Sequence, residues 1–221
     1  LTANVAQALG VISVTTESLR YSATALPLPL YHIYAFSLCV GVLPALRGHS
    51  VLIPDPRNIP LFVSAIKKLK IQIFCGLNSL FVALLENKDF CRLGFGDLKI
   101  TLSGGMPLMK SVADQWQKVT GCIISEGYGM TEASPVISMN PPGFERIGTA
   151  GIPIPGTEVK VIDGDGGEQQ VGGVGELCIK GKQIMAGYWN HPEQTAETIV
   201  DGWLHTGDVV TVDDQGYITI V

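Results

Sequence analysis

The chain has 221 residues, of which 46% are hydrophobic and 16% are charged. This balance excludes a disordered chain, because it provides enough apolar surface for a buried core. With 15 basic and 20 acidic residues, the net charge of -5 offers no attraction to phosphate backbones, which excludes a general nucleic-acid-binding protein.

The first 140 residues contain short, nearly continuous apolar runs that alternate with stretches of helical spacing. Such runs are typical of strands covered on both faces, so the alternation predicts an α/β fold with a mostly parallel sheet and helices on both faces. Pro107 suits the first position of one helix and Gly121 suits its C-terminal cap. The apolar stripe of that helix is Leu108, Val112, Trp116 and Val119. The predicted strands are 22–26, 51–54, 71–75, 98–102 and 122–125, and the other predicted helices are 61–69 and 77–85.

After about residue 141 the chain becomes rich in glycine, and its strands alternate between polar and apolar residues. This pattern predicts a small antiparallel β-sheet or distorted β-barrel. The predicted hairpins pair 158–163 with 176–180 and 209–212 with 217–220, and one short helix is predicted over 191–199. We therefore expect an α/β subdomain over 1–145 and a β-rich subdomain over 146–221.

Several features predict a reducing, cytoplasmic environment. The N-terminus lacks a secretory signal, and prolines interrupt the uncharged stretch 21–46 before it could span a bilayer. No C-x-x-C pair occurs and the four histidines are scattered, so the sequence contains no metal-ligand spacing. The five cysteines lie in apolar runs and are expected to be reduced core residues: Cys39, Cys75, Cys91, Cys122 and Cys178.

Two polar, glycine-containing segments follow predicted strands of the first part. Residues 103–107 read Ser-Gly-Gly-Met-Pro, which fits either a close approach of the backbone to a ligand or a tight turn. In the segment 125–132, Tyr128 offers a stacking face, Thr131 a donor to a phosphate oxygen, and Glu132 a hard oxygen for Mg²⁺. The alternative is an exposed loop with Thr131 as a helix N-cap.

A third segment, 203–208, reads Trp-Leu-His-Thr-Gly-Asp. The carboxylate of Asp208 could accept hydrogen bonds from the two hydroxyls of a ribose, or it could simply belong to a turn. His205 is interpreted as a surface or capping residue, because no triad accompanies it. The glycine-rich stretches 164–175 and 175–183 lack the spacing of a phosphate loop and are predicted to be turns and a strand.

Together these segments resemble the adenylate-forming superfamily of acyl-CoA synthetases, luciferases and peptide-synthetase adenylation domains. The motifs that carry the resemblance appear in the order of the family: 128–132, 175–192 and 206–208. The stretches 26–32, 78–81 and 203–208 are most similar to bacterial long-chain-fatty-acid–CoA ligases.

The resemblance implies an ATP-dependent ligase. ATP and a fatty acid would give an acyl-adenylate and pyrophosphate, and the acyl group would then pass to coenzyme A. Thr131 would hold the α-phosphate, Glu132 would hold Mg²⁺, and His32 would lie beside the acyl carboxylate. Tyr128 would pack on adenine and Asp208 would bind the ribose. The residues that would contact the nucleotide are Gly104, Gly105, Met106, Glu126, Gly127, Tyr128, Gly129, Met130 and Asp208.

The acyl tunnel of relatives matches a short apolar segment here, which would line the fatty acid through Gly76, Leu77, Asn78 and Phe81. The alternative is that this helical stripe is simply core. The expected partners are a long-chain fatty acid, ATP and CoA, with no nucleic acid, and a homodimer and peripheral contact with the inner face of the membrane are left open.

The resemblance also predicts an internal piece of a longer enzyme. The phosphate loop of the family is expected before Leu1, and the hinge and catalytic lysine after Val221, so the 221 residues alone are expected to be inactive. Two other functions remain open. One is a different adenylating enzyme, acting on a shorter acid or on an acyl-carrier protein, and the other is a non-catalytic module that binds lipid or a partner.

Overall fold

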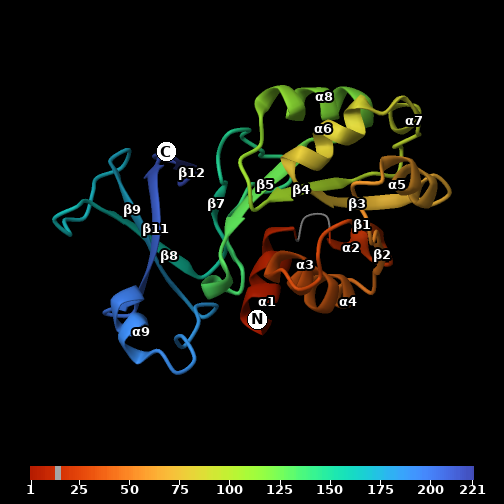
Figure 1. The fold of residues 1–221 in the computed structure, drawn as a ribbon. Coiled ribbons are helices and arrows are strands. Elements are labelled where there is room, and N and C mark those ends of the chain that lie inside the picture. Colours follow the sequence, from red (N-terminus) through yellow and green to blue (C-terminus); the bar gives the residue numbers. More distant parts are fainter. Residues whose placement is uncertain (13–15) are drawn as a thin grey trace.

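A seven-stranded sheet organises the first two thirds of the chain (Figure 1). The computed structural model describes residues 1–12 and 16–221. The strand order is β2-β1-β3-β4-β5-β6-β7, with the first five strands parallel and the last two antiparallel to their neighbours. The strands are β1 (Ala23–Leu26), β2 (His49–Leu52), β3 (Ile71–Gly76), β4 (Ile100–Gly104), β5 (Ile124–Gly129), β6 (Val136–Met139) and β7 (Ile152–Pro153). The predicted mostly parallel sheet is confirmed.

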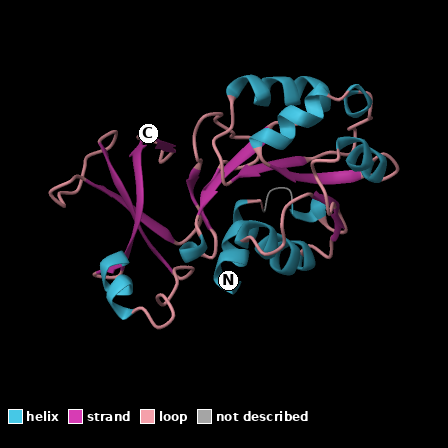
Figure 2. Ribbon diagram, in the orientation of Figure 1, coloured by secondary structure: helices cyan, strands magenta, loops and turns pink. Residues whose placement is uncertain are grey.

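Helices cover both faces of this sheet, as Figure 2 shows. One face packs on α5 (Ile59–Ile66), α6 (Asn78–Glu86), α7 (Lys88–Cys91) and α8 (Lys110–Thr120). The other packs on α1 (Thr2–Val11), α2 (Thr16–Leu19), α3 (Ile33–Ser37), the π-helical turn η2 (Leu38–Val42) and α4 (Leu43–Ala45). In β3, Phe74 enters the first core while Ile73 and Cys75 enter the second, because successive side chains of a strand point to opposite faces.

The predicted helix with the apolar stripe Leu108 to Val119 exists as α8, but it begins later than Pro107 indicates. Its first residue is Lys110. The preceding backbone bonds to a side chain outside the helix, because Met109 N donates to Asn78 Oδ1 at 2.9 Å. The prediction that Pro107 occupies the first position of this helix was therefore wrong. Gly121 is confirmed as the C-terminal cap, with a left-handed φ of 74° that glycine adopts without strain.

A second, antiparallel sheet follows, in the order β10-β11-β9-β8, with β12 paired to β11. Its strands are β8 (Thr157–Ile162), β9 (Val174–Gly181), β10 (Ile199–Val200), β11 (Trp203–Val212) and β12 (Ile218–Ile220). The short helix α9 (Pro192–Thr198) precedes β10. Both predicted hairpins are confirmed. Strand β7 lies after residue 145, the expected end of the α/β subdomain, yet it belongs to the first sheet because Ile152 pairs with Met139.

The cysteines of the described residues are free. Cys75, Cys122 and Cys178 are buried, whereas Cys39 and Cys91 are half-buried. Among the helices over 1–12 and 16–221, none combines the length and apolar character that crossing a bilayer requires.

The turn between β11 and β12 provides a test of acid stability. Asp213 Oδ1 accepts N–H bonds from Tyr217 at 2.8 Å and Gln215 at 2.9 Å, and Arg146 pairs with Oδ2 at 2.9 Å. The N–H bond from Tyr217 is the largest cause that lowers the pKa of Asp213 below its ordinary value of 3.8. A lowered folded pKa stabilises the fold above the unfolded pKa, and this contribution is lost as pH falls through the folded value.

We expect Asp213→Asn to flatten the fall of Tm below pH 4, measured on the full-length protein, whereas Asp214→Asn should leave that slope unchanged. Equal slopes in the wild type and Asp213→Asn would contradict this.

Candidate functional site

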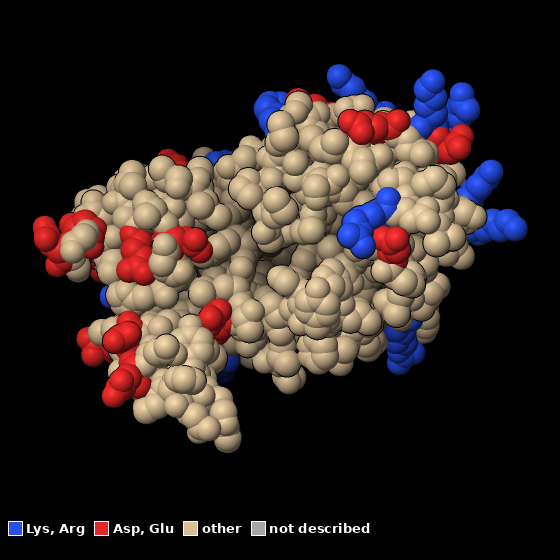
Figure 3. Space-filling view, viewed as in Figure 1, with Lys and Arg blue, Asp and Glu red and all other residues tan. Residues whose placement is uncertain are grey.

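A cavity of about 390 Å³ lies at the carboxyl ends of β4 and β5. Ligands of parallel α/β sheets gather at this edge. Figure 3 shows a hollow near the middle of the molecule, surrounded mostly by uncharged residues. The polar lining of the 390 Å³ cavity includes His32, Ser103, Gly104, Gly105, Tyr128, Thr131 and Glu132. The apolar lining of the same cavity includes Val5, Ala8, Ile12, Leu38, Val42, Leu102, Val136 and Met139.

The three segments singled out in the sequence meet in space. Gly104 pairs with Gly127 across β4 and β5, and a Cβ at Gly104 would lie 3.3 Å from the Gly127 carbonyl oxygen. From the same β5, Tyr128 donates its hydroxyl hydrogen to Asp208 Oδ2 on β11. Burial, reinforced by Asp208, raises the pKa of Tyr128. Asp208 is not among the lining residues of the cavity, so this hydrogen bond connects the cavity wall at Tyr128 to the second sheet.

Hydrogen bonds to β9 fix the irregular part of β11 that carries Asp208, between His205 and Val209. Gly207 N donates to Glu176 Oε1 at 2.9 Å, and the Thr206 hydroxyl donates to the Leu177 carbonyl oxygen at 2.8 Å. Thr206 Oγ1 also accepts from Asp208 N at 3.1 Å. The sequence analysis missed Glu176, because its contact joins residues 31 positions apart through the strand register.

Thr131 and Glu132 lie on the short 3-10 helix η3 (Thr131–Ala133) at the cavity. The N-cap of this helix is Met130, so the alternative role of Thr131 as N-cap is wrong. Glu132 Oε1 accepts the hydroxyl hydrogen of Tyr188 at 2.9 Å, which is the largest cause that raises the pKa of Tyr188. Tyr188 lies within the motif 175–192 but was given no role, because it is 56 residues away from Glu132 along the chain.

The other predicted contacts divide between the cavity and its supports. Gly127, Gly129 and Met130 line the cavity. His32 does so too, and its Nδ1 accepts from Tyr34 N at 3.2 Å as the N-cap of α3. Glu126 is not among the lining residues. It accepts N–H bonds from Leu108 at 3.3 Å and Gly148 at 2.9 Å, while burial raises its pKa.

Met106 and the predicted tunnel residues lie outside the described lining of the cavity. Met106 is 53% exposed, and Phe81 is fully buried in the core against Trp116. A Cβ on Gly76 would come within 2.8 Å of the Phe81 ring, and Asn78 is engaged by Met109 N. Leu77 packs in the core on the opposite face of the sheet. Their contact with a fatty acid stays a prediction.

Part of the apolar lining comes from α1 and its C-cap residue Ile12, a helix that was not predicted from the sequence. Val5, Ala8 and Ile12 line the cavity, and Leu9 packs in the adjoining core. Their spacing of three, four and seven residues is the signature of one helical face. This signal was present in the sequence and could have identified the helix.

An α/β domain with this cavity at its strand ends, followed by a small antiparallel sheet, has the fold of an adenylate-forming enzyme. Residues 1–189 match the AMP-binding enzyme family. The chain belongs to that family.

Curated relatives of the chain include proteins named as CoA ligases. The chain is 45% identical over 195 residues to the long-chain-fatty-acid–CoA ligase of Salmonella typhimurium, covering 88% of this chain and 35% of that protein. It is 39% identical over 203 residues to 4-coumarate–CoA ligase 2 of Oryza sativa subsp. japonica, covering 88% and 35%. The crystal structure of the anthranilate CoA ligase AuaEII in complex with anthranoyl-AMP matches with a TM-score of 0.86 and 28% identity, covering 100% of this chain and 42% of that one. The chain thus spans about a third of the length of the curated relatives.

Proposed function

We propose that the full-length protein is an ATP-dependent acid–thiol ligase that converts a long-chain fatty acid to its CoA ester. The observation that carries this proposal is that one cavity combines an apolar lining with a rim formed by Tyr128, Thr131 and Glu132. Relatives named as long-chain-fatty-acid–CoA ligases support the choice of acid.

The reaction needs positioning and charge neutralisation more than a protein nucleophile. The carboxylate oxygen of the acid attacks the α-phosphorus of ATP, and pyrophosphate leaves with the electron pair of the broken P–O bond. The thiol of CoA then loses its proton to solvent and attacks the acyl carbon, and AMP leaves with the electron pair of the broken C–O bond. Thr131 is proposed to donate to the α-phosphate, Asp208 to bind the ribose, and His32 to lie beside the acid. The Tyr128 ring is proposed to pack on adenine.

The donor set at the rim fits Mg²⁺, because a carboxylate provides the hard oxygen that this ion prefers. Glu132 is the residue proposed to hold the ion, and the hydrogen bond from Tyr188 to its Oε1 would orient the carboxylate. When bound, Mg²⁺ supplies positive charge against the phosphate oxygens.

Acid-dependent pyrophosphate exchange by the full-length protein tests the proposal across a series of acids. Each buried methylene contributes about 0.8 kcal/mol, so kcat/KM should rise with chain length until the cavity is filled. A preference for a short or aromatic acid would favour a different adenylating enzyme. Acyl transfer to a carrier protein in place of CoA would favour an acyl-carrier-protein ligase. Absence of pyrophosphate exchange with every acid would favour a non-catalytic module.

We expect the enzyme to act in the cytoplasm. Sedimentation of the purified protein would test a homodimer, and flotation with lipid vesicles would test peripheral membrane contact.

Asp208→Ala in the full-length protein is expected to weaken ATP binding by about 1.5 to 3 kcal/mol, the usual contribution of a hydrogen bond to a charged group. Calorimetric titration with ATP measures the change. Tyr128→Phe is the matched variant, because it removes the hydroxyl bound to Asp208 and retains the aromatic ring. It should weaken binding less than Asp208→Ala. An unchanged affinity in Asp208→Ala would remove this carboxylate from the nucleotide site.

A further inference from the structure

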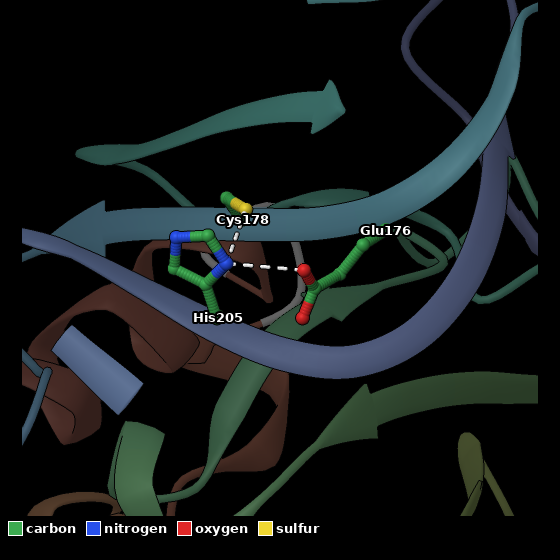
Figure 4. A group of neighbouring side chains, drawn as sticks. All are labelled: Glu176, Cys178 and His205. Atoms are coloured by element: carbon green, nitrogen blue, oxygen red, sulfur yellow. Dashed lines mark hydrogen bonds and ion pairs between the residues drawn. The ribbon is translucent and has the colours of Figure 1, made fainter. Parts of the chain in front are cut away.

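The second sheet brings together three side chains with metal-binding atoms, outside the cavity lining (Figure 4). Glu176 and Cys178 are two residues apart on β9, so their side chains share one face. His205 on β11 pairs directly with Cys178 across the ladder. The sequence analysis found no metal-ligand spacing because it considered separations along the chain, whereas the antiparallel register creates this cluster.

The distances among the three atoms suit a small cation. His205 Nδ1 lies 3.0 Å from Glu176 Oε2 and 3.6 Å from Cys178 Sγ, and all three ligand atoms lie within 4.8 Å of one another. In a tetrahedral zinc site with bonds of about 2.0 Å to nitrogen and oxygen and 2.3 Å to sulfur, neighbouring ligand atoms are separated by roughly 3.3 to 3.5 Å. Small side-chain rotations would therefore complete such a geometry.

All three atoms can donate a lone pair to one metal ion: Nδ1 of a neutral imidazole, a carboxylate oxygen and a thiolate sulfur.

The surroundings leave room for a fourth ligand. Cys178 is fully buried, whereas the side chains of His205 and Glu176 are 26% and 31% exposed, so solvent reaches the cluster from their side. Lys160 pairs with Cys178 from β8, and its ammonium group lies over the Trp203 ring, 4.6 Å from the ring centroid. A thiolate and a carboxylate together bring two negative charges to balance a divalent ion beside this lysine.

We propose that Glu176, Cys178 and His205 form a binding site for a divalent transition metal of the zinc type, with water as the fourth ligand. The thiol proton leaves to solvent when the sulfur–metal bond forms. The thiolate selects Zn²⁺ or Co²⁺ over Mg²⁺ and Ca²⁺, which prefer oxygen ligands. The ion joins β9 to β11 and holds Glu176, whose Oε1 accepts the N–H of Gly207, the residue before Asp208 on β11.

Co²⁺ and Zn²⁺ binding to the metal-free, full-length protein tests the site without ATP or acid, so the result does not depend on the proposed reaction. Co²⁺ should give the visible bands of a tetrahedral site together with a thiolate-to-cobalt charge-transfer band, and Zn²⁺ should displace it and raise Tm. Loss of an outer partner of a metal ligand already weakens binding about 10- to 100-fold. Cys178→Ala and Glu176→Gln should therefore each weaken Zn²⁺ binding at least about tenfold, and Cys178→Ala should abolish the charge-transfer band.

Cys39→Ala is the control, because it removes a half-buried thiol elsewhere in the fold. It should leave the spectrum and the Zn²⁺ affinity unchanged. Circular dichroism without metal checks that each variant folds. If Cys178→Ala does not fold, His205→Gln takes its place in the metal-binding measurements. Absence of the charge-transfer band in the wild type, or its persistence in Cys178→Ala, would overturn the proposal.

Discussion

Glu132→Gln in the full-length protein is expected to lower kcat/KM for adenylate formation about 10²- to 10³-fold, as for the loss of one preorganised electrostatic contact at a transition state. The amide has nearly the same shape and keeps an oxygen that can accept from Tyr188. It loses the anionic oxygen proposed to hold Mg²⁺ at the cavity rim. Pyrophosphate exchange measured over a range of Mg²⁺ concentrations should show a lower rate and a weaker response to the ion.

Tyr188→Phe separates positioning of Glu132 from its charge. This variant removes the 2.9 Å hydrogen bond to Oε1 but leaves the carboxylate in place. It should lower activity less than Glu132→Gln, by about 10-fold to 100-fold, the cost of losing a group that orients a metal ligand. An unchanged kcat/KM in Glu132→Gln would exclude this carboxylate from the reaction, whatever the result for Tyr188→Phe.

The central parallel strands were predictable because they are largely buried, as the four buried residues of β1 show, whereas the edge strand β2 has no buried residue. Strand β3 is a nearly continuous apolar run, interrupted only by Gln72, that ends at Gly76, and the prediction of 71–75 nearly matches it. Strand β5 extends to Gly129, well past the predicted 122–125. Its last residues include Glu126, Tyr128 and two glycines, which have no apolar pattern and are strand residues because they pair with β4 and β6.

The contacts of the site were less predictable than its motifs. The sequence placed Tyr128, Thr131 and Glu132 at a strand end, and the structure puts all three on one cavity. The contact of Glu132 with Tyr188 joins residues 56 positions apart, and that of Glu176 with His205 joins residues 29 apart. Both contacts join segments that are distant along the chain, so the spacing of residues in the sequence does not show them.

Trp116→Ala is expected to lower the free energy of unfolding by about 3 to 5 kcal/mol, the cost of removing a large aromatic side chain from a packed core. Trp116 is fully buried, with its ring centroid 4.7 Å from that of Phe81 and 5.0 Å from that of Phe74. Its Nε1 also donates to Thr101 Oγ1 at 3.1 Å, which ties α8 to β4. Truncation leaves a cavity among rigid rings that cannot collapse to fill it.

Trp189→Ala provides the comparison, because it makes the same chemical change at a side chain that is 88% exposed. Its effect should stay within about 0.5 kcal/mol. Urea unfolding of the full-length protein, followed by circular dichroism, measures both variants against the wild type. A loss below about 1 kcal/mol in Trp116→Ala would mean that the helices on this face do not depend on the aromatic cluster around Trp116. The strand ends that carry Gly104 and Tyr128 would then owe their position to the opposite face of the sheet.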